Sequence, residues 1–239
     1  MQQLNQQLTE LKLTGLRDVL RQQNEQLSLY SEQSVEERLT RLLSQALLQR
    51  DTRKIDRLTQ QAKFRVRATL EQLNYHADRQ LNKAQLRSLA QGEWLRLHQN
   101  ILITGSAGCG KTYLACALGH SHCQQGYSLL YFRLKELLEK LMLAQADGSY
   151  RSFITKISKA TLLIIDDWGL APLTVQQRGD LLELIDARYD TKSTLIASQL
   201  PIENPCRCYF RSPCSWCNKN RIKRRIDEKK AKCLTEVDH

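Results

Sequence analysis

The chain has 239 residues, of which 41% are hydrophobic, and its formal net charge at pH 7 is +11. A chain of this length can bury one core and carry a small additional module. It contains no apolar run close to the ~18 residues of a membrane span, and its first residues, MQQLNQQLTELK, are too polar for a signal peptide. We therefore expect a soluble, cytoplasmic protein with no membrane partner.

The positive charge is concentrated in two segments. Residues 51–100 carry ten Lys and Arg against five Asp and Glu, and residues 201–239 again carry ten against five. Residues 101–200 are close to balance, with ten against nine. Such an excess favours nucleic acid or another polyanion as a partner, and a solvated basic surface is the alternative.

Residues 1–67 predict a compact, all-helical N-terminal domain. Leu4, Leu8 and Leu11 keep helical spacing, and Ser34 followed by Glu37 is typical of the capping box that begins a further helix. Four cations on that helix recur at i, i+3, i+4 and i+7 and so share one face. That face is a candidate DNA-binding surface, and a solvated helix face is equally consistent with the spacing. Three further cations follow these four in the sequence. The candidate DNA-binding residues are therefore Arg50, Arg53, Lys54, Arg57, Lys63, Arg65 and Arg67.

Residues 68–97 are interpreted as a connecting segment, and residues 98–204 show alternating strands and helices. The predicted strands cover residues 100–104, 127–133, 161–166 and 193–198. The helices between them cover residues 111–122, 134–145 and 174–189. This alternation predicts an α/β fold with a parallel sheet flanked by helices.

The first predicted strand is followed by GSAGCGKT, a complete phosphate-loop motif of P-loop NTPases. The glycines permit a tight turn whose backbone N–H groups surround a β-phosphate, next to the N-terminus of the new helix. Lys111 supplies a positive charge to the β- and γ-phosphates, and the Thr112 hydroxyl is a ligand for Mg²⁺. The predicted ATP-binding residues are Gly105, Ser106, Ala107, Gly108, Cys109, Gly110, Lys111 and Thr112.

Two later strands end in polar residues that complete this site. Asp166 ends the strand LLIID, where a carboxylate reaches the Mg²⁺ shell beside the phosphate loop. Asp167 is the candidate for polarising the attacking water, with a cap or turn role as the alternative. Ser198 and Gln199 end the fourth strand, where a polar side chain can contact the γ-phosphate or the water. The predicted catalytic residues are Lys111, Asp166, Asp167 and Gln199.

Four segments of residues 1–204 resemble the IstB group of AAA+ ATPases, the helper proteins of bacterial insertion sequences. They are GSAGCGKTYLACALGH, DGSYRS, TLLIIDDWGLAPLT and TLIASQLPIEN. The resemblance implies an ATP- and Mg²⁺-dependent protein that binds and bends double-stranded DNA, forms homo-oligomers on it, and recruits and stimulates a cognate transposase. It also implies a Walker A element at 105–112, Walker B at Asp166 and Asp167, and a first sensor at Gln199. The alternatives are a DnaC-like helicase loader and a nucleotide-binding DNA or scaffold protein without turnover.

The stretch PCRCYFRSPCSWC contains Cys206, Cys208, Cys214 and Cys217, which could hold Zn²⁺ as four thiolates. The gap between the two pairs is short for a zinc ribbon or finger. Three of the other cysteines, Cys109, Cys116 and Cys123, are expected to be reduced and structural.

A frame-shifted tail explains the same stretch better. Members of the IstB group continue with a segment resembling TLADAILDRLVHNAYRIELKGESMRK, which is missing here. Codons can be chosen for residues 204–230 that spell TLADAIFDR, then LVHGAI, then RIELKGESMRKK one base later. We interpret residues 205–239 as an out-of-frame, disordered tail that leaves the ATPase core incomplete. Loss of an arginine from this region predicts retained ATP binding and weak assembly-coupled hydrolysis.

Overall fold

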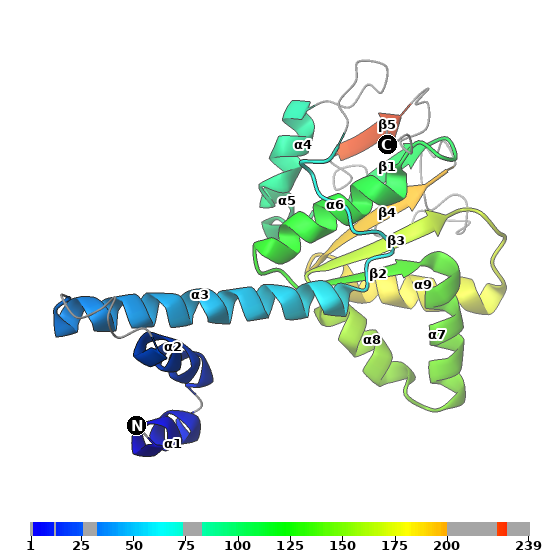
Figure 1. Cartoon of the computed structure of the whole chain (residues 1–239). Coiled ribbons are helices and arrows are strands. Elements are labelled where there is room, and N and C mark those ends of the chain that lie inside the picture. The colour runs from blue at the N-terminus through cyan, green and yellow to red at the C-terminus, as the bar shows by residue number, and fades with distance from the viewer. Residues whose placement is uncertain (1, 12, 26–32, 74–82, 200–223, 229–239) are drawn as a thin grey trace. The chain divides into compact units, whose positions relative to one another are not determined.

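The computed structural model describes residues 2–11, 13–25, 33–73, 83–199 and 224–228 (Figure 1). The chain divides into two compact units, Met1–Arg57 and Leu58–His239. This division falls within a helix, ten residues before the predicted domain boundary after residue 67. Among the described residues, no helix is long and apolar enough to cross a membrane.

The first unit is helical, as predicted, and contains α1 (Gln2–Glu10), α2 (Thr14–Glu25) and most of α3 (Val35–Ala62). The predicted capping box opens α3. The backbone N–H of Glu37 donates to Ser34 Oγ at 3.2 Å, and the backbone N–H of Ser34 donates to Glu37 Oε2 at 2.8 Å. These reciprocal bonds satisfy donors that the first turn of a helix otherwise leaves unpaired.

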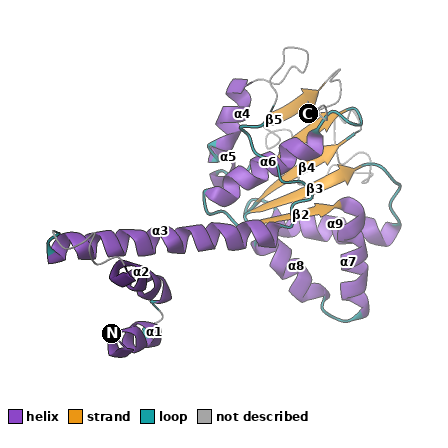
Figure 2. Ribbon diagram, viewed as in Figure 1, coloured by secondary structure: helices purple, strands orange, loops and turns teal. Residues whose placement is uncertain are grey.

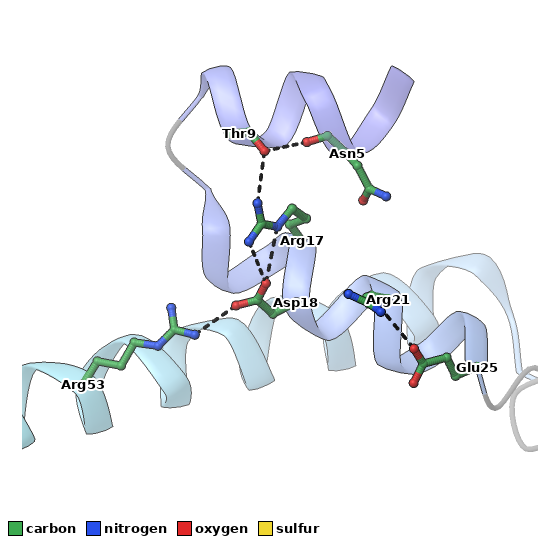
Figure 3. A network of polar contacts seen from close by, with 7 residues as sticks. All are labelled: Asn5, Thr9, Arg17, Asp18, Arg21, Glu25 and Arg53. Atoms are coloured by element: carbon green, nitrogen blue, oxygen red, sulfur yellow. Dashed lines mark hydrogen bonds and ion pairs between the residues drawn. The ribbon is translucent and has the colours of Figure 1, made fainter. Parts of the chain in front are cut away.

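A network of polar contacts links the helices of this unit (Figure 3). Asp18 of α2 accepts a hydrogen bond from Arg53 of α3 at 2.9 Å and another from its neighbour Arg17 at 3.1 Å. Arg17 also donates to Thr9 of α1 at 3.4 Å. The two arginines lower the pKa of the Asp18 carboxyl group through these hydrogen bonds. Since all of these side chains are substantially exposed, solvent weakens the contribution of the network to stability.

The second unit is built on a parallel sheet in the order β2-β3-β4-β1-β5 (Figure 2). Its strands are β1 (Ile101–Gly105), β2 (Leu129–Arg133), β3 (Leu162–Trp168), β4 (Ser193–Ser198) and β5 (Arg224–Glu228). The first four are the strands that the sequence predicts. Of these, β3, β4 and β1 are the central strands and are almost entirely buried, as their continuous apolar runs require, and β2 lies at one edge.

Helices cover both faces of this sheet. One face packs on α4 (Lys83–Ala90), α5 (Glu93–Arg96), α6 (Lys111–Gln124) and the end of α3, while the other packs on α7 (Leu134–Ala146), α8 (Tyr150–Lys159) and α9 (Val175–Arg188) (Figure 1). Each face of the sheet has its own hydrophobic core, the first beneath α4, α5 and α6 and the second beneath α7, α8 and α9. Successive residues of β3 point into opposite cores, since Ile164 lies in the first and Leu163 and Ile165 lie in the second. The α/β architecture with flanking helices is therefore confirmed.

Three features differ from the expectations. Residues 224–228 form a fifth strand, so the predicted disorder of the tail is wrong for this segment, and the rest of residues 205–239 lies outside the described residues. Helix α8 lies between the predicted helix at 134–145 and the predicted strand at 161–166, where no helix was predicted. The predicted connecting segment contributes Leu86, Leu89, Trp94 and Leu95 to the first core and is therefore part of the folded unit.

Candidate nucleotide-binding site

Four of the eight predicted ATP-binding residues, Gly108, Gly110, Lys111 and Thr112, line a cavity of about 440 Å³ at the carboxyl edge of the sheet. The loop after β1, the end of β3 and the end of β4 meet there because these three strands are neighbours and parallel. The lining residues are Arg65, Val66, Gly108, Gly110, Lys111, Thr112, Tyr113, Asp166, Asp167, Ala197 and Gln199.

The phosphate loop adopts backbone angles that favour glycine at two positions. Gly108 has φ = 78° and Gly110 has φ = 92°, and Gly110 is the N-cap of α6. The Lys111 side chain is buried and folds back over the loop, where its ammonium group donates to the Ser106 carbonyl at 2.6 Å. The start of α6 thus combines a cation with the backbone N–H groups of a helix N-terminus, which is an arrangement suited to a phosphate anion.

Asp166 is buried at the end of β3 and joins two other elements. Its Oδ2 accepts hydrogen bonds from the Thr112 hydroxyl at 2.6 Å and from the Tyr131 hydroxyl at 2.8 Å. Its Oδ1 accepts the backbone N–H of Asp167 at 2.8 Å. A carboxylate and a hydroxyl in contact beside the phosphate loop are oxygen donors of the type that Mg²⁺ prefers, so Thr112 and Asp166 fit the predicted metal position.

Asp167 occupies an irregular point of β3. The register between β3 and β4 shifts between Ile165 and Trp168, and Asp167 has φ = 59°, in the left-handed region. Such an irregularity can redirect a side chain, and Asp167 lines the cavity. Burial raises the pKa of Asp167, as does the Asp166 carboxylate, while nearby cations oppose the shift.

The two polar residues at the end of β4 have different surroundings. Gln199 lines the cavity. The Ser198 hydroxyl is buried and donates to the Trp168 carbonyl at 2.9 Å, so it ties β4 to β3. The structure thus brings Lys111, Asp166, Asp167 and Gln199 to one cavity, as the strand order implies.

Two residues of the site were missed from the sequence. Tyr131 of β2 donates a hydrogen bond to Asp166 of the neighbouring strand β3, and burial raises the pKa of Tyr131. Arg65 precedes the sheet by more than thirty residues, yet it lines the cavity, and its guanidinium lies 3.9 Å from Asp167 Oδ2. The only local signal for Tyr131 was its place in an apolar strand. The charge pattern around Arg65 suggested DNA binding instead of a place at the nucleotide site.

The candidate DNA-binding residues do not form one continuous helical face. Arg50, Arg53, Lys54 and Arg57 are exposed on α3, and Arg53 is paired with Asp18. Helix α3 ends at Ala62, so the remaining candidates, Lys63, Arg65 and Arg67, follow the helix. All three are exposed, and Arg65 lies at the nucleotide cavity.

The cysteines of the described residues agree with the expectation of a reduced, structural role. Cys109, Cys116 and Cys123 are buried and form no disulfide with one another, and burial raises the pKa of both Cys116 and Cys123 to about 11. Within the described part of the chain no cluster of His, Cys, Asp and Glu could hold a metal ion by itself. Cys206, Cys208, Cys214 and Cys217 lie outside it.

Comparison with known proteins identifies close sequence relatives. Residues 6–209 match the family model described as IstB-like ATP binding protein. The ATP-binding protein of insertion sequence IS1162 from Pseudomonas fluorescens is 44% identical over 198 residues, which is 82% of this chain and 84% of the relative. An insertion-sequence ATP-binding protein from Mycobacterium tuberculosis is 30% identical over 206 residues, 86% of this chain and 82% of the relative.

Solved structures share the fold at low sequence identity. AMPPCP-bound DnaA from Aquifex aeolicus superposes with a TM-score of 0.57 at 18% identity, over 70% of this chain and 51% of that one. The DnaC helicase loader gives a TM-score of 0.53 at 20% identity, over 61% of this chain and 87% of that one. These similarities establish an AAA+-type P-loop fold.

Proposed function

The chain belongs to the IstB-like ATP-binding proteins of insertion sequences, and on that premise we propose that it is an ATP-dependent helper of DNA transposition. In this role it binds double-stranded DNA and recruits or stimulates a cognate transposase. The observation that carries the proposal is the cavity in which Lys111, Thr112, Asp166, Asp167 and Gln199 meet. The relatives named for insertion sequences favour transposition over helicase loading, because the likeness to DnaC concerns the fold alone.

Each predicted site residue that lines the cavity has a role that follows from its position. The loop from Gly105 to Thr112 holds the phosphates of ATP through backbone N–H groups, and Lys111 leaves its bond to Ser106 to contact the β- and γ-phosphates. Thr112 and Asp166 hold Mg²⁺, which neutralises phosphate charge when bound.

Asp167 and Gln199 lie where the attacking water and the terminal phosphate are expected. An ionised Asp167 orients the water and accepts its proton, and the Gln199 amide contacts the terminal phosphate. Tyr131 keeps the Asp166 carboxylate in place through its hydrogen bond of 2.8 Å.

Nucleotide affinity tests the site directly. We expect Lys111→Ala to weaken ATP binding by at least about tenfold, since it removes a buried cation from the phosphate position. Isothermal titration with Mg-ATP measures this, and Lys135→Ala is the matched control because Lys135 is 89% exposed and does not line the cavity. Equal ATP affinity of the two variants would contradict the assignment.

The exposed cations of α3 are the proposed contact with DNA phosphates. Replacement of Arg50, Lys54 and Arg57 by Gln removes three cations that are exposed on one helix and leaves the Arg53–Asp18 pair intact. We expect the affinity for duplex DNA to fall, and the slope of log affinity against log salt to decrease by about 3.

A charge-matched control separates a contact from a general electrostatic effect. It replaces the exposed cations Arg21, Arg96 and Lys135 by Gln and so changes the net charge by the same amount. Fluorescence anisotropy with a labelled duplex at several salt concentrations measures both sets. Equal losses would reject α3 as the contact surface and leave its cations as a solvated face.

A further inference from the structure

Arg65 lies at the nucleotide cavity, although the charge pattern of the sequence groups it with the DNA-binding candidates. We propose that Arg65 is a nucleotide-binding residue that contacts the terminal phosphate of ATP from within the same chain. The inference rests on the proposed function, because it assumes that the cavity holds ATP.

The backbone around Arg65 is held against α6. Helix α3 ends at Ala62, and Lys63 takes a left-handed conformation with φ = 53°. Phe64 then packs against the first core. The Phe64 ring lies against Gly119 of α6, and the backbone of Val66 and Arg65 lies near the buried Cys116 thiol of the same helix. The start of the Arg65 side chain is therefore fixed relative to the helix that begins at the phosphate loop.

The Arg65 side chain is half exposed and directed toward Asp167. Its guanidinium lies 3.9 Å from Asp167 Oδ2, a separation at which the two charges attract without a tight hydrogen bond. The positive charge opposes the rise in the pKa of Asp167. Because Asp167 lies on the side of the proposed attacking water, Arg65 is nearer to the position of the terminal phosphate than to that of a nucleoside.

Arg65 determines whether the formal charge of the cavity lining is neutral or negative. The lining contains two cations, Arg65 and Lys111, and two acids, Asp166 and Asp167, so its formal charge is zero when all four are ionised. Without Arg65 the lining would carry a net negative charge, which opposes a polyanionic ligand. The guanidinium can bind a phosphate through two donors, and it can leave Asp167 without breaking a short hydrogen bond.

The test compares two arginines two residues apart. Arg67 is exposed in the same segment and does not line the cavity, so Arg67→Gln is the matched control for Arg65→Gln. Affinities for Mg-ATP and Mg-ADP are measured by isothermal titration on the full chain. We expect Arg65→Gln to weaken ATP binding about tenfold and ADP binding less than about threefold, with Arg67→Gln unchanged and Arg65→Lys in between.

Three results would overturn the inference. One is equal ATP affinity for Arg65→Gln and Arg67→Gln, and another is an equal loss of ATP and ADP affinity in Arg65→Gln. The third is a loss of duplex DNA affinity in Arg65→Gln with ATP binding unchanged, which would return Arg65 to the DNA-binding set. Thermal unfolding of each variant identifies a folding defect, and a Lys111→Ala variant that binds ATP normally would overturn the proposed function as well.

Discussion

At the scale of single residues, Asp167 combines several unfavourable features. It is an acid with φ = 59°, it adjoins the Asp166 carboxylate, and its pKa is raised chiefly by burial. A raised pKa means that the folded state binds the proton more tightly than the unfolded state does. Stability from this group is therefore present in full below the unfolded pKa and is lost as pH rises through the folded pKa. Near neutral pH, the ionised carboxylate opposes folding.

Substitution of Asp167 by Asn is accordingly expected to stabilise the protein. Asn removes the partly buried charge and also tolerates a left-handed backbone. We expect Tm at pH 7 to rise by about 2–4 °C, the change that 1 kcal/mol produces in a protein of this size, while hydrolysis decreases. The gain should shrink as pH falls toward the unfolded pKa. Thermal unfolding at several pH values measures it, with the exposed Asp56→Asn as the control. A lower Tm for Asp167→Asn at pH 7 would contradict this account.

At the scale of elements, the contact between α6 and the segment after α3 positions the site. A Cβ atom at Gly119 of α6 would lie 2.6 Å from Phe64 Cε1 and 2.9 Å from Ile164 Cδ1. Gly119 is therefore a position at which the Phe64 ring and Ile164 of β3 approach the helix closely. Arg65 follows Phe64 directly, so this packing contact also bears on the nucleotide cavity.

Alanine substitutions at two helical glycines test this packing. Gly119→Ala gains about 1 kcal/mol of helix propensity but overpacks the core, and the second effect is the larger, at about 1–3 kcal/mol. We expect a net loss of about 1 kcal/mol in the free energy of unfolding, together with weaker ATP binding as Phe64 shifts. Gly179→Ala on α9 is the control, because nothing lies within 4 Å of its Cβ position, and it should be neutral or stabilising. Urea unfolding measures the free energy of unfolding of both variants. Equal changes in the two variants would reject a tight contact between α6 and Phe64.

At the scale of the whole molecule, the question is whether the tail, residues 205–239, is an out-of-frame translation. The family match ends at residue 209, and the described part of the tail is β5, which pairs with β1 in parallel. A strand pairs through its backbone, so an edge position accepts the polar sequence RRIDE. The proposed frame shift remains a prediction, and the gene decides it. Codons for residues 204–230 that do not spell TLADAIFDR and the segments after it one base later would refute it.

We expect this chain to bind ATP but to show weak or no DNA-stimulated, cooperative hydrolysis. The reason is the proposed loss of an arginine that would act on a neighbouring subunit, since such a residue can change turnover by about 10³–10⁵-fold. Phosphate release with and without duplex DNA measures it, and the IS1162 relative from Pseudomonas fluorescens, which is similar over 82% of this chain, provides the comparison. Robust cooperative hydrolysis that Lys111→Ala abolishes would contradict this expectation and exclude a scaffold without turnover.

The sequence by itself determined the phosphate loop, Asp166, the first four strands and the capping box at Ser34, because each depends on local spacing or backbone preference. It did not assign Arg65, Tyr131, β5 or the packing of residues 68–97, since these depend on contacts between segments far apart in the chain. A charged residue near other cations looks the same in a sequence whether it faces solvent or a cavity. Only the tertiary structure, in which α6 holds the segment after α3, decided that Arg65 lies beside Asp167.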